Sequence, residues 1–321
     1  MPGRRRPEQP SVAIVTDSTA SLPEGAAERW GVGVVPLDVV VDGERHVEGV
    51  DLSPQALLAA LTKGVTVTTS QPPPAAFASA YERAAASGAR EIVSIHLSGE
   101  LSGTVRAARL AAESSSVPVH VVDSGVVAMA LGFAVLDAAR FSAGPEVAVT
   151  AAAPAPGPLA AARAWWHARA RPEARLPSGG EVAEHARTVA ASTRVWFLVD
   201  SLDHLRRGGR LSVPATAIGI VLGLRPILTL HAGGIDVLEK VRTRRAARDR
   251  LVALAVADVV RRSSARIAVH HLGQPELAEA LAAEVAAAAG DRLAETAVCE
   301  SSAVLAAHAG PGLLAVVVAE A

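Results

Sequence analysis

The sequence predicts an α/β fold of two domains: an N-terminal domain built on a largely parallel sheet and a C-terminal α/β domain. The chain has 321 residues, a length that suggests two domains. Half of its residues are hydrophobic and the mean hydropathy is +0.31, so the chain can bury a sizeable core. Strand-like and helix-like segments alternate along it, which is typical of sheets with parallel strands.

The N-terminal elements are expected to follow one another as strand, turn and helix. The first strand is the β-branched run "VAIVT" at 12–16. Ser21 and Glu24 have the spacing of a capping box, which marks the start of a helix. A turn is expected at Asp42–Gly43. Further strands are expected at 32–41, 91–97 and 118–124, and further helices at 53–64, at 75–88, within 98–114 and at 126–141.

The C-terminal half repeats this alternation. A helix is expected at 180–192 and a strand at 194–199, followed by a turn-rich motif at 200–212. A hairpin-like region, a helix and a strand–helix pair beginning at 266 come next. The last strand is the apolar run that follows "GPG" near the C-terminus.

Three ranges describe the predicted domain organisation. Residues 11–141 form the N-terminal domain and residues 181–321 the C-terminal domain. The stretch 142–180 between them is rich in alanine, proline and glycine, a composition that disfavours a packed core. It is therefore interpreted as a mobile insertion or linker.

Composition excludes several classes of function. The net charge is −1 and aromatic residues make up 3% of the chain, so neither a basic field nor stacking platforms for nucleic acid are present. Cys299 is the only cysteine, which excludes an internal disulfide and a cysteine-based zinc site. The apolar runs are shorter than a membrane span and no secretory signal is recognised, so a soluble, cytoplasmic protein is expected.

Polar turns follow three of the expected strands. They contain Asp17, then Ser98 with Gly99, and then Ser124. Open α/β sheets bind ligands at the carboxyl ends of their strands, so these turns are candidates for one binding edge. Each of them is equally an ordinary helix cap, and this alternative stays open.

The stretch "TTSQPPP" at 68–74 raises a related possibility. Consecutive prolines exclude a helix interior and supply no donors to a sheet. An ordered turn that presents Thr68, Thr69, Ser70 and Gln71 is therefore expected, with a plain surface loop as the alternative.

The motif "DSLDHLRRGGRLS" at 200–212 places Arg210 after two glycines. One of the glycines can end a helix in the left-handed conformation, and the arginine beside such a turn can bind a carboxylate or phosphate. His270, taken alone, is interpreted as a hydrogen-bonded core histidine. Neutral donors, one arginine, one histidine and much aliphatic surface together suit a small acidic head group with a long apolar tail.

The motifs resemble those of the DegV family of fatty-acid-binding proteins. "VTDSTASLP", "TSQP", "LSGELSGT", "VVDS", "LDHLRRGGRLS", "EKVRTRRAA" and "HAGPG" occur in the order and spacing of that family. The resemblance extends over residues 11–318, except for 142–180. It implies a two-domain DegV-like fold with one long-chain fatty acid buried between the domains.

The resemblance also implies roles for particular residues. Thr69, Ser98 and His270 match positions that bind the carboxylate. Arg210 matches the arginine of the family's "GGR" motif, linked to the head group and to a partner, and His308 belongs to its "H-x-GPG" turn. Further ligand or partner contacts are expected from Ser70, Gly99, Asp17 and Ser124. Two departures from the family pattern, Pro73 and Gly99, each remove a possible hydroxyl donor.

By the same resemblance, the chain is not an enzyme. It is expected to act as a monomer that presents its fatty acid to a fatty acid kinase, which forms an acyl-phosphate for phospholipid synthesis. No catalytic residue, cofactor or metal is expected. Contact with a membrane is expected to be transient at most. The alternatives are a serine hydrolase of lipid esters, a phosphotransferase using Asp17 and Asp123 with magnesium, and a degenerate member that retains only the fold. The missing nucleophile elbow and phosphate-binding loop argue against both enzymes.

Overall fold

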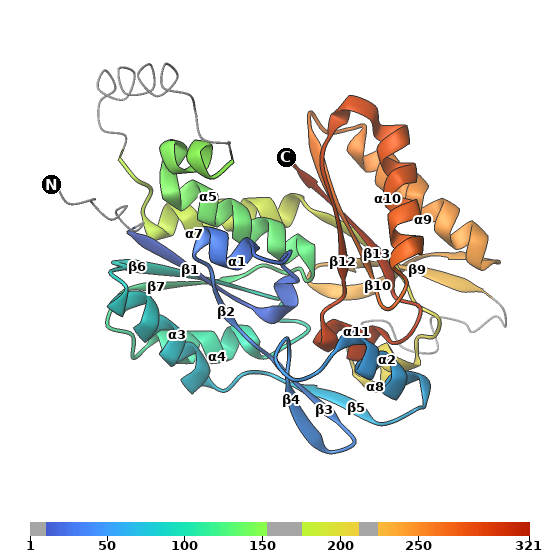
Figure 1. The fold of residues 1–321 in the computed structure, drawn as a ribbon, viewed down its shortest axis with the longest axis horizontal. Helices are drawn as coiled ribbons and strands as arrows, with labels where there is room; N and C mark the ends of the chain where they lie inside the picture. Colours follow the sequence, from blue (N-terminus) through green and yellow to red (C-terminus); the bar gives the residue numbers. More distant parts are fainter. Residues whose placement is uncertain (1–10, 153–174, 212–223) are drawn as a thin grey trace, which may run out of the picture.

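A computed structural model of the protein describes residues 11–152, 175–211 and 224–321, which form three β-sheets and the helices packed on them (Figure 1). The first sheet has the strand order β2-β1-β6-β7, and all its neighbouring strands are parallel. Its strands are β1 (Val12–Asp17), β2 (Gly33–Val35), β6 (Glu91–His96) and β7 (Val119–Asp123). The predicted parallel sheet of the N-terminal domain is therefore confirmed.

A small antiparallel sheet projects from the first one. It has the order β4-β3-β5 and consists of β3 (Asp38–Val41), β4 (Glu44–Val47) and β5 (Val67–Ser70). The turn between β3 and β4 is formed by Asp42 and Gly43, whose φ values of 51° and 85° suit a tight hairpin. That predicted turn is confirmed.

The largest sheet is mixed and has the order β10-β9-β8-β13-β11-β12. Its strands are β8 (Arg194–Leu198), β9 (Arg225–His231), β10 (Gly234–Val241), β11 (Ala265–His271), β12 (Leu293–Glu300) and β13 (Leu314–Glu320). Only the pair β11–β12 is parallel. The side chains of each strand alternate between two faces, and both faces of the central strands are buried.

Helices cover both sides of the parallel sheet (Figure 1). On one side lie α3 (Pro74–Ala86) and α4 (Thr104–Ala112), and on the other lie α1 (Ala26–Trp30), α5 (Met129–Ala152) and α7 (Gly179–Ser192). The outer face of the mixed sheet is covered by α9 (Arg244–Val259) and α10 (Pro275–Ala289). The short elements are α2 (Pro54–Thr62), α8 (Asp203–Arg207), α11 (Ala303–Ala309) and the 3₁₀ turns η1 (Ser18–Ala20) and η2 (Gly290–Arg292).

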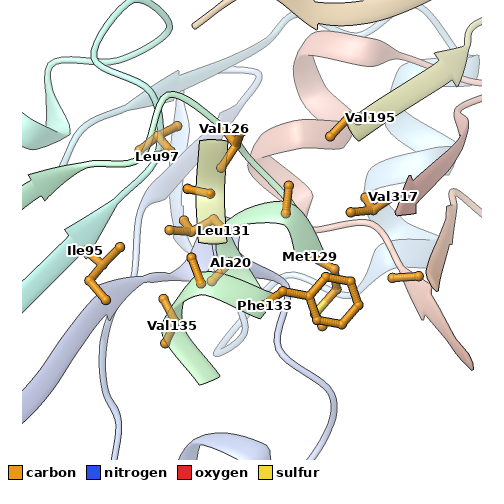
Figure 2. Packing of buried hydrophobic residues seen from close by; sticks show 14 of the residues in the cluster. Ala20, Ile95, Leu97, Val126, Met129, Leu131, Phe133, Val135, Val195 and Val317 are labelled. Atoms are coloured by element: carbon orange, nitrogen blue, oxygen red, sulfur yellow. The ribbon is translucent and has the colours of Figure 1, made fainter. Parts of the chain in front are cut away.

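The first half of α5 lies between the two large sheets. Figure 2 shows Met129 and Phe133 of this helix near Val195 and Val317 of the mixed sheet. One apolar cluster therefore continues from the parallel sheet to the inner face of the mixed sheet, with α5 as the shared layer. No helix among the described residues has the length and apolar character needed to span a bilayer.

A buried ion pair reinforces this layer. Arg266 of β11 is 2% exposed and binds both carboxylate oxygens of Asp137 on α5. The guanidinium carbon of Arg266 also lies 4.5 Å from the ring centre of Phe133. The positive charge is thus compensated by one carboxylate and one aromatic face.

The predicted domain ranges remain a prediction, but the structure shows where the second sheet begins. Helix α7, which the ranges assign to the C-terminal domain, packs on α5 and on β6 and β7 of the parallel sheet. The chain enters the mixed sheet with β8. Residues 142–152 continue α5 beyond a break at Gly144, and residues 153–174 of the expected linker lie outside the described residues.

Two local predictions are wrong. Ser21 does not begin a helix: it closes η1 with a φ of 48°, and α1 starts after Gly25 without a side-chain cap. Thr68, Thr69 and Ser70 form strand β5 rather than a turn, because β5 pairs with β3 at the edge of the small sheet. Edge strands tolerate a following proline, and Pro74 takes the first position of α3.

Candidate functional site

A cavity of about 370 Å³ lies where the parallel sheet, the small sheet and the inner face of the mixed sheet meet. Loops after β6 and β7 contribute to it, as expected for the carboxyl ends of parallel strands. Its apolar lining consists of Leu37, Leu97, Leu101, Val127, Ala128, Val195, Phe197, Leu205, Leu230, Ile235, Val304, Leu305, Ala309, Leu313 and Ala315. Its polar lining residues are Thr69, Ser70, Gln71, Ser102, Arg210, His270, Ser301 and His308, and Gly103 completes it.

The polar lining is concentrated in one group, here called the polar cluster: Thr69, Ser70, Gln71, Ser102, Arg210 and His308. Thr69 Oγ1 lies 2.8 Å from His308 Nε2, and the Arg210 Nε–H donates to the Leu101 carbonyl at 3.0 Å. The cluster therefore joins β5, the loop after β6, the turn after α8 and the end of α11. The fold thus brings together residues that lie more than two hundred positions apart in the sequence, such as Thr69 and His308.

Local backbone features hold the polar cluster in place. Gly209 has a φ of 69° and ends the turn after α8, so that Arg210 turns back toward the cavity. A Cβ on Gly103 would lie 1.7 Å from Gln71 Oε1, so with any larger residue at position 103 the Gln71 side chain would have to take another position. Helix α11, which carries His308, begins with a bond from the Val304 N–H to Glu48 Oε1 at 2.7 Å.

The polar cluster is partly exposed, whereas the interior of the cavity is buried. Ser70 and Gln71 are exposed, whereas Thr69, Arg210 and His308 are half-buried. Phe197, His270 and Ala315 at the inner wall are each less than a tenth exposed. The polar cluster thus contains the most exposed lining residues and is here called the mouth of the cavity, while most of the aliphatic lining is buried.

Electrostatics give the mouth one positive charge. Burial, together with the neighbouring Arg210, lowers the pKa of His308 to about 4, so its imidazole is neutral at neutral pH. Arg210 is the one lysine or arginine among the described lining residues. A monoanion with an apolar tail fits a mouth of this kind, because one cation and several neutral donors face it.

His270 does not join the polar cluster. It lies on β11 opposite Ala315 of β13, and its Nε2 accepts a hydrogen bond from the Met129 N–H at 3.1 Å. The side chain lines the buried wall and ties the mixed sheet to the start of α5. Its Nδ1 is buried and has no hydrogen-bond partner among the described residues, so the predicted carboxylate contact of His270 stays a prediction.

Acidification is expected to destabilise the protein through His270. Burial lowers the pKa of His270 to about 4, with a smaller contribution from His271. An unfolded histidine takes up a proton near pH 6.5, so the unfolded chain binds more protons between about pH 6.5 and pH 4 and stability falls over that window. Chemical unfolding at a series of pH values measures the free energy of unfolding. In His270→Gln this free energy should fall less steeply with decreasing pH than in the wild-type protein. The exposed His231→Gln serves as control and should keep the wild-type slope; equal slopes for all three proteins would contradict the prediction.

The other predicted contacts lie outside the cavity lining. The Ser98 hydroxyl donates to the Gly233 carbonyl at 2.7 Å, and Ser124 bonds within its own turn to Val126. The Gly99 N–H donates to Asp123 Oδ1 at 3.0 Å, and a Cβ at position 99 would lie 2.5 Å from Asp123 Oδ2. Glycine therefore fits at position 99 because Asp123 occupies the adjacent space. Neither Gly99 nor Pro73 lines the cavity.

Asp17 belongs to a buried series of hydrogen-bonded side chains. Its Oδ2 lies 2.9 Å from His96 Nδ1, and His96 Nε2 lies 2.6 Å from Ser94 Oγ. The Ser–His–Asp order resembles a catalytic triad, but all three side chains are fully buried, and the Tyr81 hydroxyl donates to Ser94. An ester cannot reach Ser94. The arrangement instead fixes β1 to β6, because Asp17 Oδ2 also accepts from the Leu97 N–H.

The two carboxylates named for the phosphotransferase alternative are both engaged in hydrogen bonds. The carboxylate of Asp17 is occupied by Thr19, His96 and Leu97, and Asp123 Oδ1 accepts from Gly99 and Gly125. The described residues contain no group of three histidine, cysteine or acidic side chains that could hold a metal ion.

The sequence profile of the DegV family, described as "Uncharacterised protein, DegV family", matches residues 11–146 and 177–321. A DegV domain-containing protein of Streptomyces coelicolor is 46% identical over 313 residues, which is 96% of this chain and 98% of the relative. A DegV domain-containing protein of Mycobacterium bovis is 34% identical over 96% of this chain and 97% of its own length.

Solved structures of DegV family proteins also resemble this chain. A DegV family protein from Thermus thermophilus, described by its fatty acid binding, superposes with a TM-score of 0.78 at 30% identity, covering 97% of this chain and 99% of that one. DegV of Bacillus subtilis, described as a fatty acid binding protein, superposes with a TM-score of 0.76 at 28% identity and the same coverage.

Proposed function

The chain belongs to the DegV family, and on that basis we propose that it binds one long-chain fatty acid in the cavity, with the carboxylate in the polar cluster and the alkyl chain against the aliphatic lining. The observation that carries this proposal is the division of the cavity: one cation and several neutral donors at the mouth, and apolar side chains behind them. Arg210, Thr69 and Ser102 supply donors to the carboxylate. Burial of the tail supplies most of the affinity.

The mouth position also supports the role of a carrier. A carboxylate beside the exposed Ser70 and Gln71 lies near the surface while its tail stays dry. A separate fatty acid kinase could therefore reach it and form the acyl-phosphate used in phospholipid synthesis, and the chain itself would catalyse no step. We place this carrier in the cytoplasm, as a monomer with at most transient membrane contact.

Thr69→Ala is expected to weaken binding of a long-chain fatty acid roughly tenfold. The substitution removes a donor to a charged group, a loss of about 1.5 kcal/mol, and leaves His308 without its 2.8 Å partner. Isothermal titration calorimetry with oleic acid measures the change. Thr68→Ala on the same strand is the matched control, because Thr68 is exposed and does not line the cavity.

The neutral counterpart of the ligand tests the head-group assignment. The methyl ester of the same acid should bind the wild-type protein much more weakly than the free acid. In Thr69→Ala, the difference between the affinities for acid and ester should be smaller than in the wild-type protein. Equal binding of acid and ester by the wild-type protein would contradict a carboxylate site at the mouth. Loss of binding in Thr68→Ala would show that the strand, rather than the Thr69 hydroxyl, is responsible.

A further inference from the structure

Helix α11 supplies a wall of the cavity and one residue of the polar cluster. Its side chains Val304, Leu305 and Ala309 belong to the apolar lining, and His308 lies beside Thr69. The helix follows β12 in the sequence, but it packs on β3 and β5 of the small sheet and on α2 and α8 (Figure 1). The shape of the mouth therefore depends on where α11 lies relative to the small sheet.

The start of α11 is held by a side chain from the N-terminal half of the chain. The Val304 N–H, one of the first N–H groups of the helix, donates to Glu48 Oε1 at 2.7 Å across 256 positions of sequence. Such N–H groups have no partner within the helix and need one from outside. Because Val304 is 4% exposed, loss of the Glu48 carboxyl would leave a buried N–H without a partner. The next turn position is capped locally, since the Ser302 hydroxyl accepts from the Leu305 N–H at 3.3 Å.

Glu48 is itself fixed to the parallel sheet. It follows β4 directly, and its N–H donates to the Leu37 carbonyl at 3.0 Å. The Leu37 N–H in turn donates at 3.0 Å to the hydroxyl of Ser18, the residue after β1. Leu37 also lines the cavity. A continuous series of hydrogen bonds therefore leads from the end of β1, through one lining residue, to the start of the helix that carries four more.

The Glu48 side chain is buried outside the cavity lining. It is 7% exposed and is not among the lining residues, so a ligand in the cavity would not take the place of Val304 at the carboxyl. Burial raises the pKa of this carboxyl above its ordinary value. Both the ionised and the protonated carboxyl offer an oxygen that accepts from the Val304 N–H, and so does the amide of glutamine.

We propose that Glu48 is a positioning residue of the fatty-acid site: its carboxyl fixes the start of α11, and the fixed helix holds His308 beside Thr69 at the mouth. The inference rests on the proposed fatty-acid binding. Glu48 and Thr69 bind opposite ends of the same short helix, the first through Val304 and the second through His308. Loss of the Glu48 bond leaves the start of α11 free to shift, and such a shift moves His308 and the apolar wall together.

Three variants and a control test the effect on binding. Glu48→Leu removes the acceptor but keeps most of the side-chain volume, so Kd for oleic acid should rise by roughly five- to tenfold, as expected when a buried N–H loses its partner. Glu48→Gln keeps the acceptor and should bind within about twofold of the wild-type protein. Ser302→Ala removes the other bond at the start of α11 and should weaken binding in the same direction. Glu44→Ala, exposed on β4, is the matched control and should leave Kd unchanged.

The titration of His308 reports the position of α11 without any ligand. Burial and the neighbouring Arg210 lower the pKa of His308 to about 4 in the wild-type protein. In Glu48→Leu this pKa should rise toward the ordinary value of about 6.5, because a displaced helix exposes the imidazole to water. Imidazole NMR signals of the folded proteins, followed from about pH 8 to about pH 5, should therefore show His308 taking up a proton in Glu48→Leu and staying neutral in the wild-type protein and in Glu48→Gln.

Each outcome supports or overturns the role of Glu48. An unchanged Kd or an unchanged His308 titration in Glu48→Leu, with the protein folded by urea titration, would overturn it. Equal losses of affinity in Glu48→Gln and Glu48→Leu would also overturn it, because the acceptor would then be unimportant. If Glu48→Leu does not fold, Ser302→Ala takes its place in both measurements, and wild-type values there would contradict the proposal. A wild-type protein that fails to bind oleic acid would refute the proposed function, while the His308 titration would still test whether Glu48 positions α11.

Discussion

Arg210→Ala should lower the affinity for a long-chain fatty acid by about a hundredfold. Arg210 carries the one positive charge among the described lining residues, and His308 beside it is kept neutral by its lowered pKa. A charge-assisted hydrogen bond to a carboxylate contributes about 1.5–3 kcal/mol, and a half-buried mouth screens it less than bulk water does. Titration of oleic acid into wild-type and variant protein measures the effect.

Two controls separate the charge of Arg210 from its structural bonds. Arg210 also donates to the carbonyls of Leu101 and Gly208, so its loss could disturb the loop. A fatty alcohol of the same length has no charge, and its affinity should be similar in wild type and Arg210→Ala. Equal losses for acid and alcohol would assign Arg210 a purely structural role. Arg207→Ala, an exposed arginine of α8, should leave both affinities unchanged.

Asp137→Ala is expected to destabilise the protein by about 3–5 kcal/mol, because it leaves the buried guanidinium of Arg266 without its carboxylate. Arg266 is 2% exposed, and its Nε has no hydrogen-bond partner among the described residues, so no other group replaces Asp137. The free energy of unfolding in urea, extrapolated to water, measures the loss.

The neighbouring Arg140 provides the matched control. Arg140 binds the same carboxylate at 3.3 Å but its side chain is 37% exposed, so Arg140→Ala should cost less than about 1 kcal/mol. Combining Asp137→Leu with Arg266→Met should recover most of the stability, because no unpaired charge remains in the core. If Asp137→Ala and Arg140→Ala lowered the free energy of unfolding equally, the claim that the buried Arg266–Asp137 pair stabilises the fold would be contradicted.

Much of the fold could be predicted because local signals agree with the tertiary structure. The helix at α2 begins with Ser53 as N-cap and Pro54 at its first position, and its stop at Gly64 has a φ of 72°, as the sequence indicates. The Asp42–Gly43 turn follows from the same kind of local chemistry. Ser21 fails as a helix start because its turn is fixed by the neighbouring Asp17 network instead.

The site could be predicted only in part. Thr69, Arg210 and His308 are brought together as their motifs implied. The hydrogen bond from Ser98 to Gly233 could not be predicted from the loop sequence, because its partner lies in a hairpin 135 residues away. Likewise, the hydrogen bond between the Met129 N–H and His270 depends on how the start of α5 packs against the mixed sheet, which no local motif shows.

The most direct test of fatty-acid binding is mass spectrometry of the purified protein and of its organic extract. The account predicts one long-chain fatty acid per chain, removed by delipidation and restored by incubation with a mixture of fatty acids. In Arg210→Ala the restored occupancy should be much lower. A wild-type protein that carries no fatty acid before delipidation and takes up none from the mixture would contradict the account.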